Sequence, residues 1–225
     1  MRRFRDRADA GRQLAAALAG YAARDPVVLA LPRGGVPVGA EVARALHAPL
    51  DLVLVRKIGL PDQPEVAMGA VVEGLGADPI VVRNTDIIAF GGVDAATFDA
   101  IRRRELEEIE RRRVRYLGAR PRVPVAGRVV IVVDDGIATG ATVTAALRAL
   151  RALRPKALVL AVPVAPAETL AALRRQVDDL VCLLTPRAFD AIGAFYDDFS
   201  QLDDEEVEDE LLRCPVPPPG SKPRA

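Results

Sequence analysis

Two adjacent carboxylates, Asp134 and Asp135, stand beside a short stretch that holds two glycines and two threonines. Carboxylates can hold the hydroxyl groups of a sugar, because each ionised oxygen accepts hydrogen bonds. Gly136 and Gly140 allow the backbone to turn tightly and to approach a ligand closely. Backbone amides in such a loop, assisted by threonine hydroxyls, suit a phosphate. These residue types in this order indicate a site for a sugar phosphate.

The elements around this pair predict where it lies. The apolar run 129–133 has the composition of a parallel strand that is covered on both faces. Ligands of open α/β sheets bind at the carboxyl ends of such strands, and the amides of residues 137–142 would begin the next helix. The alternative is an ordinary strand–turn–helix in which Thr142 only caps the helix. Two neighbouring acids without a ligand would repel each other, which favours the binding site.

A second turn, Pro32-Arg33-Gly34-Gly35, follows the short apolar strand predicted at 27–31. Its glycines permit backbone amides to approach an anion, and the planar guanidinium of Arg33 matches phosphate oxygens. A generic strand-to-helix turn would also use glycines, so this turn alone decides little. Its combination with the Asp134 loop favours a site that holds two anionic groups.

The stretch from Asp134 to Thr142, with the strand before it, resembles the phosphoribosyl-pyrophosphate (PRPP) binding motif of the type I phosphoribosyltransferases. That motif is a hydrophobic strand, two acidic residues and a short loop rich in glycine and threonine. The resemblance implies that Asp134 and Asp135 hold the ribose hydroxyls of PRPP. It also implies that the 5-phosphate is bound by the loop residues Gly136, Ile137, Ala138, Thr139, Gly140, Ala141 and Thr142.

The Arg33 turn is similar to the pyrophosphate loop of the same family, which can contain a non-proline cis peptide bond. The resemblance implies that Arg33, Gly34 and Gly35 bind the pyrophosphate. A flexible loop that closes over the site and brings in a basic residue is also typical of the family. Lys57 and Arg56 are the candidates for that role, with a solvated strand end as the alternative.

The family resemblance also implies Mg²⁺, held by PRPP itself and by Asp134 and Asp135. Glu65 closes the polar loop predicted at 57–65, where it either contacts Mg²⁺ or only orients the loop. The sequence does not choose between these two roles. Together, Asp134, Asp135, Arg33 and Lys57 form the predicted catalytic group.

Composition excludes some classes of protein. The 225 residues carry 31 Lys+Arg and 31 Asp+Glu, so the zero net charge gives no bulk attraction to nucleic acid or to an anionic membrane. No apolar run approaches about 18 residues, so no membrane span is expected. The charged start lacks a signal-peptide core, and the two isolated cysteines, Cys182 and Cys214, are typical of a reducing compartment. We therefore expect a cytoplasmic protein.

Helices and strands alternate along the chain, which predicts an α/β fold with a doubly wound parallel sheet and a Rossmann-like core. A β-α-β unit spans 27–56, with its second strand at 50–56, and a long charged helix spans 94–117. The resemblance adds a small hood over the site, assigned to about 57–95 and the chain ends. We expect one domain over 1–213, including an acidic helix at 203–212, and a disordered Pro-rich tail over 214–225.

The predicted activity is transfer of ribose 5-phosphate from PRPP to an acceptor, with release of pyrophosphate. A nitrogenous base is the expected acceptor, but no pattern identifies it. The alternatives are a non-catalytic PRPP or nucleotide sensor, and a domain that works beside a hydrolase or another partner on an unusual acceptor. The aromatic pair Phe195-Tyr196 could stack on an acceptor ring, although core packing is favoured. The resemblance implies a homodimer, which no sequence feature requires.

Overall fold

The computed structural model describes residues 3–74, 78–118 and 120–214. Its centre is a parallel sheet in the order β2-β1-β6-β7-β8. The strands are β1 (Val27–Ala30), β2 (Leu50–Leu52), β6 (Val129–Val133), β7 (Ala157–Val164) and β8 (Asp179–Leu184). The predicted α/β class with a parallel central sheet is confirmed.

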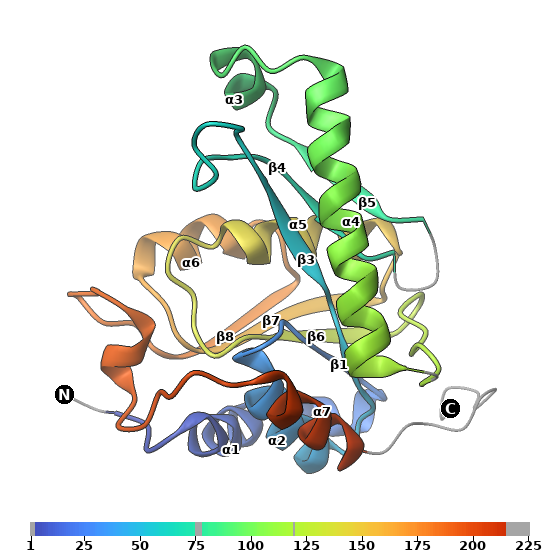
Figure 1. Cartoon of the computed structure of the whole chain (residues 1–225). Helices are drawn as coiled ribbons and strands as arrows, with labels where there is room; N and C mark the ends of the chain where they lie inside the picture. Colours follow the sequence, from blue (N-terminus) through green and yellow to red (C-terminus); the bar gives the residue numbers. More distant parts are fainter. Residues whose placement is uncertain (1–2, 75–77, 119, 215–225) are drawn as a thin grey trace.

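Helices cover both faces of this sheet (Figure 1). Successive side chains along a strand point to opposite faces of the sheet. Val28 and Ile131 therefore belong to the buried cluster on one face, and Val27 and Val130 to the cluster on the other. The first face is covered by α1 (Arg7–Ala17), α2 (Gly35–Leu46) and α7 (Asp204–Leu212). The second face is covered by α5 (Ala141–Ala152) and α6 (Ala167–Arg174). Two short 3-10 helices are also present, η1 (Ala19–Arg24) and η2 (Ile192–Phe195).

The hood is an antiparallel sheet with two helices. It contains β3 (Val55–Gly59), β4 (Ala67–Val72), β5 (Ile80–Arg83), α3 (Thr85–Phe90) and α4 (Ala95–Leu117). Figure 1 places this unit above the parallel sheet, with α4 running along its side. The long helix predicted at 94–117 is confirmed as α4. Asp94 caps this helix, because its side chain accepts a hydrogen bond from the Thr97 amide.

One predicted strand was wrong. The run 50–56 divides into β2, which joins the parallel sheet, and the start of β3, which joins the hood. The break falls at Val53 and Leu54, and both are buried. Because the run stays apolar across the change of sheet, its pattern gives no sign of the break. Lys57, predicted in a loop, lies within β3.

The chain ends meet at the carboxyl edge of the parallel sheet. Phe4 and Tyr196 form a bridge, and their rings lie 5.4 Å apart between centroids. Phe195 and Tyr196 are almost fully buried, so packing, the favoured interpretation of this pair, is confirmed. Cys214, the first residue of the tail predicted at 214–225, is also buried. The remaining predicted tail lies outside the described residues.

Candidate active site

Asp134 and Asp135 follow directly after β6, as predicted. The Asp135 amide donates to Asp134 Oδ1 at 2.9 Å, and the Asp135 side chain is nearly covered. Burial raises the pKa of Asp134 well above its usual range, and repulsion from Asp135 adds to this. Burial also raises the pKa of Asp135. The carboxylates therefore occupy a site where a hydroxyl-bearing or cationic ligand would relieve an unfavourable charge.

Arg7, at the start of α1, is the partner that sequence analysis missed. Its Nε donates to Asp135 Oδ2 at 2.8 Å, and its Nη1 donates to the Ser200 carbonyl at 2.8 Å. The guanidinium lies 3.9 Å from the centre of the Phe199 ring. Only 11% of the Arg7 side chain is exposed, so this is a buried ion pair. No motif marks Arg7 in a chain with many arginines, and its partner is distant in sequence.

The Pro32–Gly35 turn packs directly against the acidic pair. A Cβ atom on Gly34 would lie 1.9 Å from Asp135 Oδ2, and one on Gly35 would lie 2.8 Å from the Val133 carbonyl. Only glycine fits at these two positions without displacing the neighbouring segment. The Pro32–Arg33 peptide bond is cis, as the resemblance implied for this turn. The structure therefore brings together the two turns that the sequence placed about a hundred residues apart.

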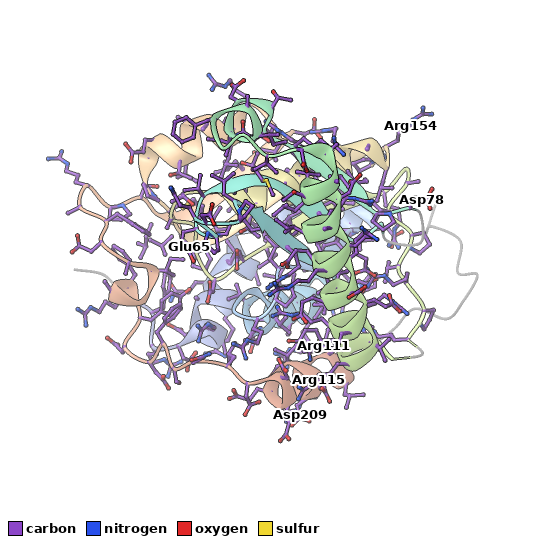
Figure 2. All side chains as sticks on the ribbon, turned by 45° about the horizontal axis from the view of Figure 1, so that its top comes forward. Glu65, Asp78, Arg111, Arg115, Arg154 and Asp209 are labelled. Atoms are coloured by element: carbon purple, nitrogen blue, oxygen red, sulfur yellow. The ribbon has the colours of Figure 1, made fainter. Side chains whose placement is uncertain are left out.

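Arg33 projects toward α7. Its Nη1 lies 3.8 Å from Asp204 Oδ1, and Asp204 also accepts the Tyr116 hydroxyl at 2.5 Å. Arg115 of α4, labelled in Figure 2, pairs with the same carboxylate. The predicted anion-binding guanidinium is therefore in contact with an acid from the C-terminal helix.

Arg56 and Lys57 are neighbours on β3, so their side chains point to opposite faces of the strand. Arg56 donates to Glu105 Oε2 at 2.8 Å, and it lines a small cavity of about 20 Å³ together with Pro32 and Thr142. Lys57 Nζ instead lies 3.0 Å from Glu65 Oε2 across the hairpin (Figure 2 labels Glu65). Arg56 thus reaches both turns, whereas Lys57 is held at the hood surface by Glu65.

The loop before α5 is hydrogen-bonded to β7 and α6 on one side and is exposed to solvent on the other. The Ile137 amide donates to the Val164 carbonyl at 2.9 Å, so in this structure it is not free for a phosphate. Thr169 Oγ1 of α6 donates to the Ala138 carbonyl at 2.8 Å. Gly140 has a φ of 75° and precedes the helix, which begins at Ala141. The exposed part of the predicted phosphate loop is Ala138, Thr139, Ala141 and Thr142.

The protein side of the site offers few metal ligands. Within the described residues, no group of three or more His, Cys, Asp and Glu side chains is placed to hold a metal ion. The acidic pair supplies two carboxylates. That set suits Mg²⁺ only if a substrate contributes most of the oxygen ligands, which is how Mg²⁺ commonly binds beside phosphates.

A parallel α/β fold in which an acidic pair, a glycine turn and a small-residue loop meet at one sheet edge is a nucleotide- or sugar-phosphate-binding type of protein. Residues 4–198 match the model of the phosphoribosyl transferase domain family, so the chain belongs to that family. Two Mycobacterium tuberculosis proteins, from strains CDC 1551 and H37Rv, are each 48% identical over 207 residues and are provisionally named phosphoribosyl transferases.

These matches cover 92% of this chain and 46% of each relative, so the chain spans about half the length of the curated relatives. Among solved structures, TT1426 from Thermus thermophilus is 43% identical and superposes with a TM-score of 0.81. That comparison covers 95% of this chain and 99% of TT1426. No helix in the described parts is both long and apolar enough to span a membrane.

Proposed function

We propose that this protein transfers the ribose 5-phosphate group of PRPP to an acceptor and releases pyrophosphate. The contact between the two turns carries this proposal. Because Gly34 lies against Asp135, a pyrophosphate on the first turn and a ribose on the acidic pair would be adjacent. Phosphate and pyrophosphate sites that flank a hydroxyl-binding pair match the chemical outline of PRPP.

The residues take distinct roles in this proposal. Asp134 and Asp135 accept hydrogen bonds from the ribose hydroxyls, and the exposed loop at 138–142 holds the 5-phosphate. The two carboxylates also stabilise the positive charge that develops on the ribose ring as the bond to pyrophosphate breaks. Arg33 and Arg56 stabilise the negative charge that grows on the departing pyrophosphate. Lys57 joins them once the hood hairpin moves and the Glu65 contact opens.

Mg²⁺ fits this donor set as a partner of the substrate. Asp134 and Asp135 would hold it together with oxygens of PRPP, and the ion would neutralise charge on the leaving group. A nitrogenous base remains the proposed acceptor, and a homodimer the proposed assembly. Since the two curated relatives are about twice as long, a partner segment that supplies or consumes the acceptor is compatible with this role.

A non-catalytic PRPP or nucleotide sensor is the second candidate. One observation favours it. Arg33 contacts Asp204 and Lys57 contacts Glu65, so both cations are already engaged by acids of this chain. A sensor would bind PRPP without assembling these cations around the pyrophosphate. Turnover separates the two candidates.

The test measures pyrophosphate release with PRPP, Mg²⁺ and a panel of purine, pyrimidine and nicotinate-type acceptors. We expect release with at least one acceptor, and a loss of at least about a hundredfold in the variant Asp134→Asn/Asp135→Asn. Asp209→Asn, which removes an exposed carboxylate on α7 (Figure 2), is the matched control and should behave like the wild type.

Two results would contradict the proposed transferase activity. Tight PRPP binding without release, across the whole panel, favours the sensor. Failure of the wild type to bind PRPP at all, with the double variant indistinguishable from it, contradicts any PRPP-based function.

A further inference from the structure

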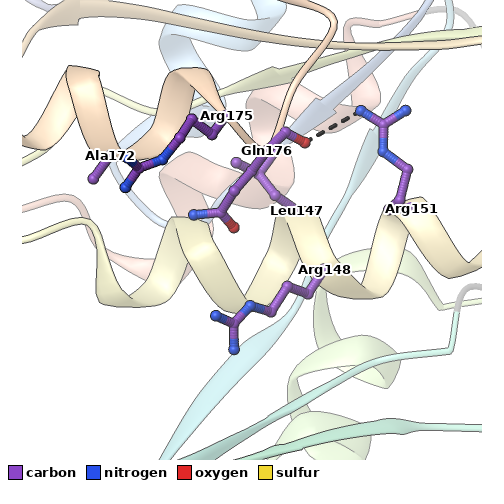
Figure 3. A pocket seen from close by; sticks show the side chains of 6 residues that line it. All are labelled: Leu147, Arg148, Arg151, Ala172, Arg175 and Gln176. Atoms are coloured by element: carbon purple, nitrogen blue, oxygen red, sulfur yellow. Dashed lines mark hydrogen bonds between the residues drawn. The ribbon is translucent and has the colours of Figure 1, made fainter.

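A second concave site lies between α5 and α6, on the outer face of the molecule. It has a volume of about 460 Å³, which falls within the range of small-molecule sites. Six side chains line it, as shown in Figure 3: Leu147, Arg148, Arg151, Ala172, Arg175 and Gln176. We call it the α5–α6 groove. None of the residues of the Arg33 turn, the acidic pair or the phosphate loop lines it.

Three arginines surround this groove, and only one of them is neutralised. Arg151 pairs with Asp178 at 2.9 Å and donates to the Gln176 carbonyl at 3.2 Å, so its position is fixed. Among the described residues, the guanidiniums of Arg148 and Arg175 have no ion-pair or hydrogen-bond partner. Most arginines of the described chain do pair with an acid or a carbonyl, as Arg122 does with Asp51. Two unpaired guanidiniums at one groove therefore favour an anion.

Gln176 supplies polar recognition between these two charges. Figure 3 shows its side-chain amide lying between Arg148 and Arg175, beside Leu147. The Gln176 Oε1 atom has no hydrogen-bond partner, although it is buried. An unpaired buried acceptor is unfavourable, so a ligand that donates a hydrogen bond to this amide would gain from it. Because this oxygen is buried, it becomes available to a ligand in the groove only when the amide turns about its last side-chain bond.

The groove also has an apolar floor. Leu147 is almost fully buried and Ala172 presents only a methyl group. A flat ring can lie on such a floor, and guanidinium planes stack on aromatic rings. An inorganic anion alone would use the arginines but not the apolar floor.

We propose that the α5–α6 groove binds a nucleoside phosphate. Its phosphates are held by the guanidiniums of Arg148 and Arg175, and its base lies over Leu147 and Ala172 with a ring or amino N–H donated to Gln176. The ligand would join the two helices that support the phosphate loop, since Thr169 of α6 bonds to Ala138. This site is separate from the PRPP site and does not depend on the proposed transferase activity.

The experiment uses the full chain with Asp134→Asn/Asp135→Asn, which removes the hydroxyl-binding carboxylates of the PRPP site, and the groove variants below separate the remaining binding at that site from binding at the groove. Titration calorimetry with ATP, GTP and tripolyphosphate then measures affinity for the groove. We expect a nucleotide to bind, and Arg148→Gln/Arg175→Gln to weaken it at least tenfold. Arg154→Gln, an exposed arginine outside the groove (Figure 2), removes a charge nearby and should change the affinity less than twofold.

A further variant tests the nucleoside part. Gln176→Leu should weaken the nucleotide at least fivefold and leave tripolyphosphate unchanged. Circular dichroism confirms that each variant is folded. Absence of nucleotide binding up to millimolar concentrations, or an equal loss in Arg154→Gln, would overturn the proposal. Equal affinity for tripolyphosphate and nucleotide, with no effect of Gln176→Leu, would overturn the assignment of a nucleoside phosphate.

Discussion

Arg7 sets the charge state of the acidic pair. The Asp135 carboxyl is drawn toward its neutral form by burial and back toward its ionised form by the Arg7 guanidinium. Without that guanidinium, the pKa of Asp135 would lie further above its usual range. The carboxylate can accept hydrogen bonds from ribose on all its oxygens only when it is ionised. Arg7 therefore favours the ionised form of Asp135, which is the form that accepts hydrogen bonds from a sugar through both oxygens.

Replacing Arg7 tests this role. Arg7→Gln should move the acid limb of PRPP binding, or of pyrophosphate release, to higher pH, and should lower the free energy of unfolding by about 3–5 kcal/mol. The measurement is affinity or rate between pH 5 and 9, with chemical denaturation alongside. Arg5→Gln is the matched control, because the Arg5 side chain is 74% exposed and only approaches Asp9. An unshifted acid limb in Arg7→Gln would show that Arg7 has no such effect.

Apart from Arg56 and Lys57, the site residues that the sequence predicted lie in two short continuous motifs. Asp134 and Gly34 could be assigned because residue type and strand context are both local. Arg7 could not, because its role depends on a contact between distant parts of the chain. The pairing of Lys57 with Glu65 was equally hidden, since it follows from the register of a hairpin.

At the scale of elements, a buried ion cluster joins the hood to the core. Arg122, which precedes β6, lies 2.7 Å from Asp51 of β2 and 2.9 Å from Glu73, which follows β4. The Val123 amide donates to Asp51 at 2.9 Å. Burial raises the pKa of Glu73 to about 7, with Arg122 opposing and Asp51 reinforcing the rise. Arg113 and Glu110 of α4 also act on this carboxyl, with opposite signs.

This cluster makes the stability of the protein depend on pH. The folded state favours protonated Glu73, so the associated stabilisation is complete below the ordinary pKa of 4.5 and is lost as pH rises through about 7. We expect the unfolding free energy of the wild type to fall from pH 5 to pH 8 relative to Glu73→Gln. Urea denaturation at four pH values measures this difference. Glu107→Gln on the exposed face of α4 should follow the wild type. Parallel curves for wild type and Glu73→Gln would contradict the prediction.

Sequence patterns predict only part of the hood. Its long helix could be predicted because charged and apolar residues alternate with helical spacing over many turns. The separation of β2 from β3 could not, because Val53 and Leu54 are buried where the chain leaves one sheet for the other. Strand periodicity reports burial, and the chain stays buried through the break between the two strands.

At the scale of the whole molecule, the N-terminal segment and the segment around Tyr196 close together beside the acidic pair. The Phe4 amide donates to Phe195 at 2.9 Å, and the Asp197 amide donates to Phe4 at 2.8 Å. Tyr196 then reaches the Asp135 carbonyl through its hydroxyl at 2.5 Å. Arg7 follows Phe4 in the chain and reaches the Asp135 carboxylate. The same closure therefore orders both supports of the acidic pair.

Phe4 is the residue on which this closure can be tested, because its ring is fully buried against Tyr196. Phe4→Ala should lower the free energy of unfolding by about 3–5 kcal/mol, and it should weaken PRPP binding even at temperatures where the variant is folded. Phe90→Ala removes the same ring from α3, where it is 83% exposed, and should change stability by less than about 0.5 kcal/mol. Denaturation curves and PRPP titrations of both variants provide the comparison. If Phe4→Ala loses stability but keeps full affinity for PRPP when folded, the chain ends hold the fold together without positioning the acidic pair.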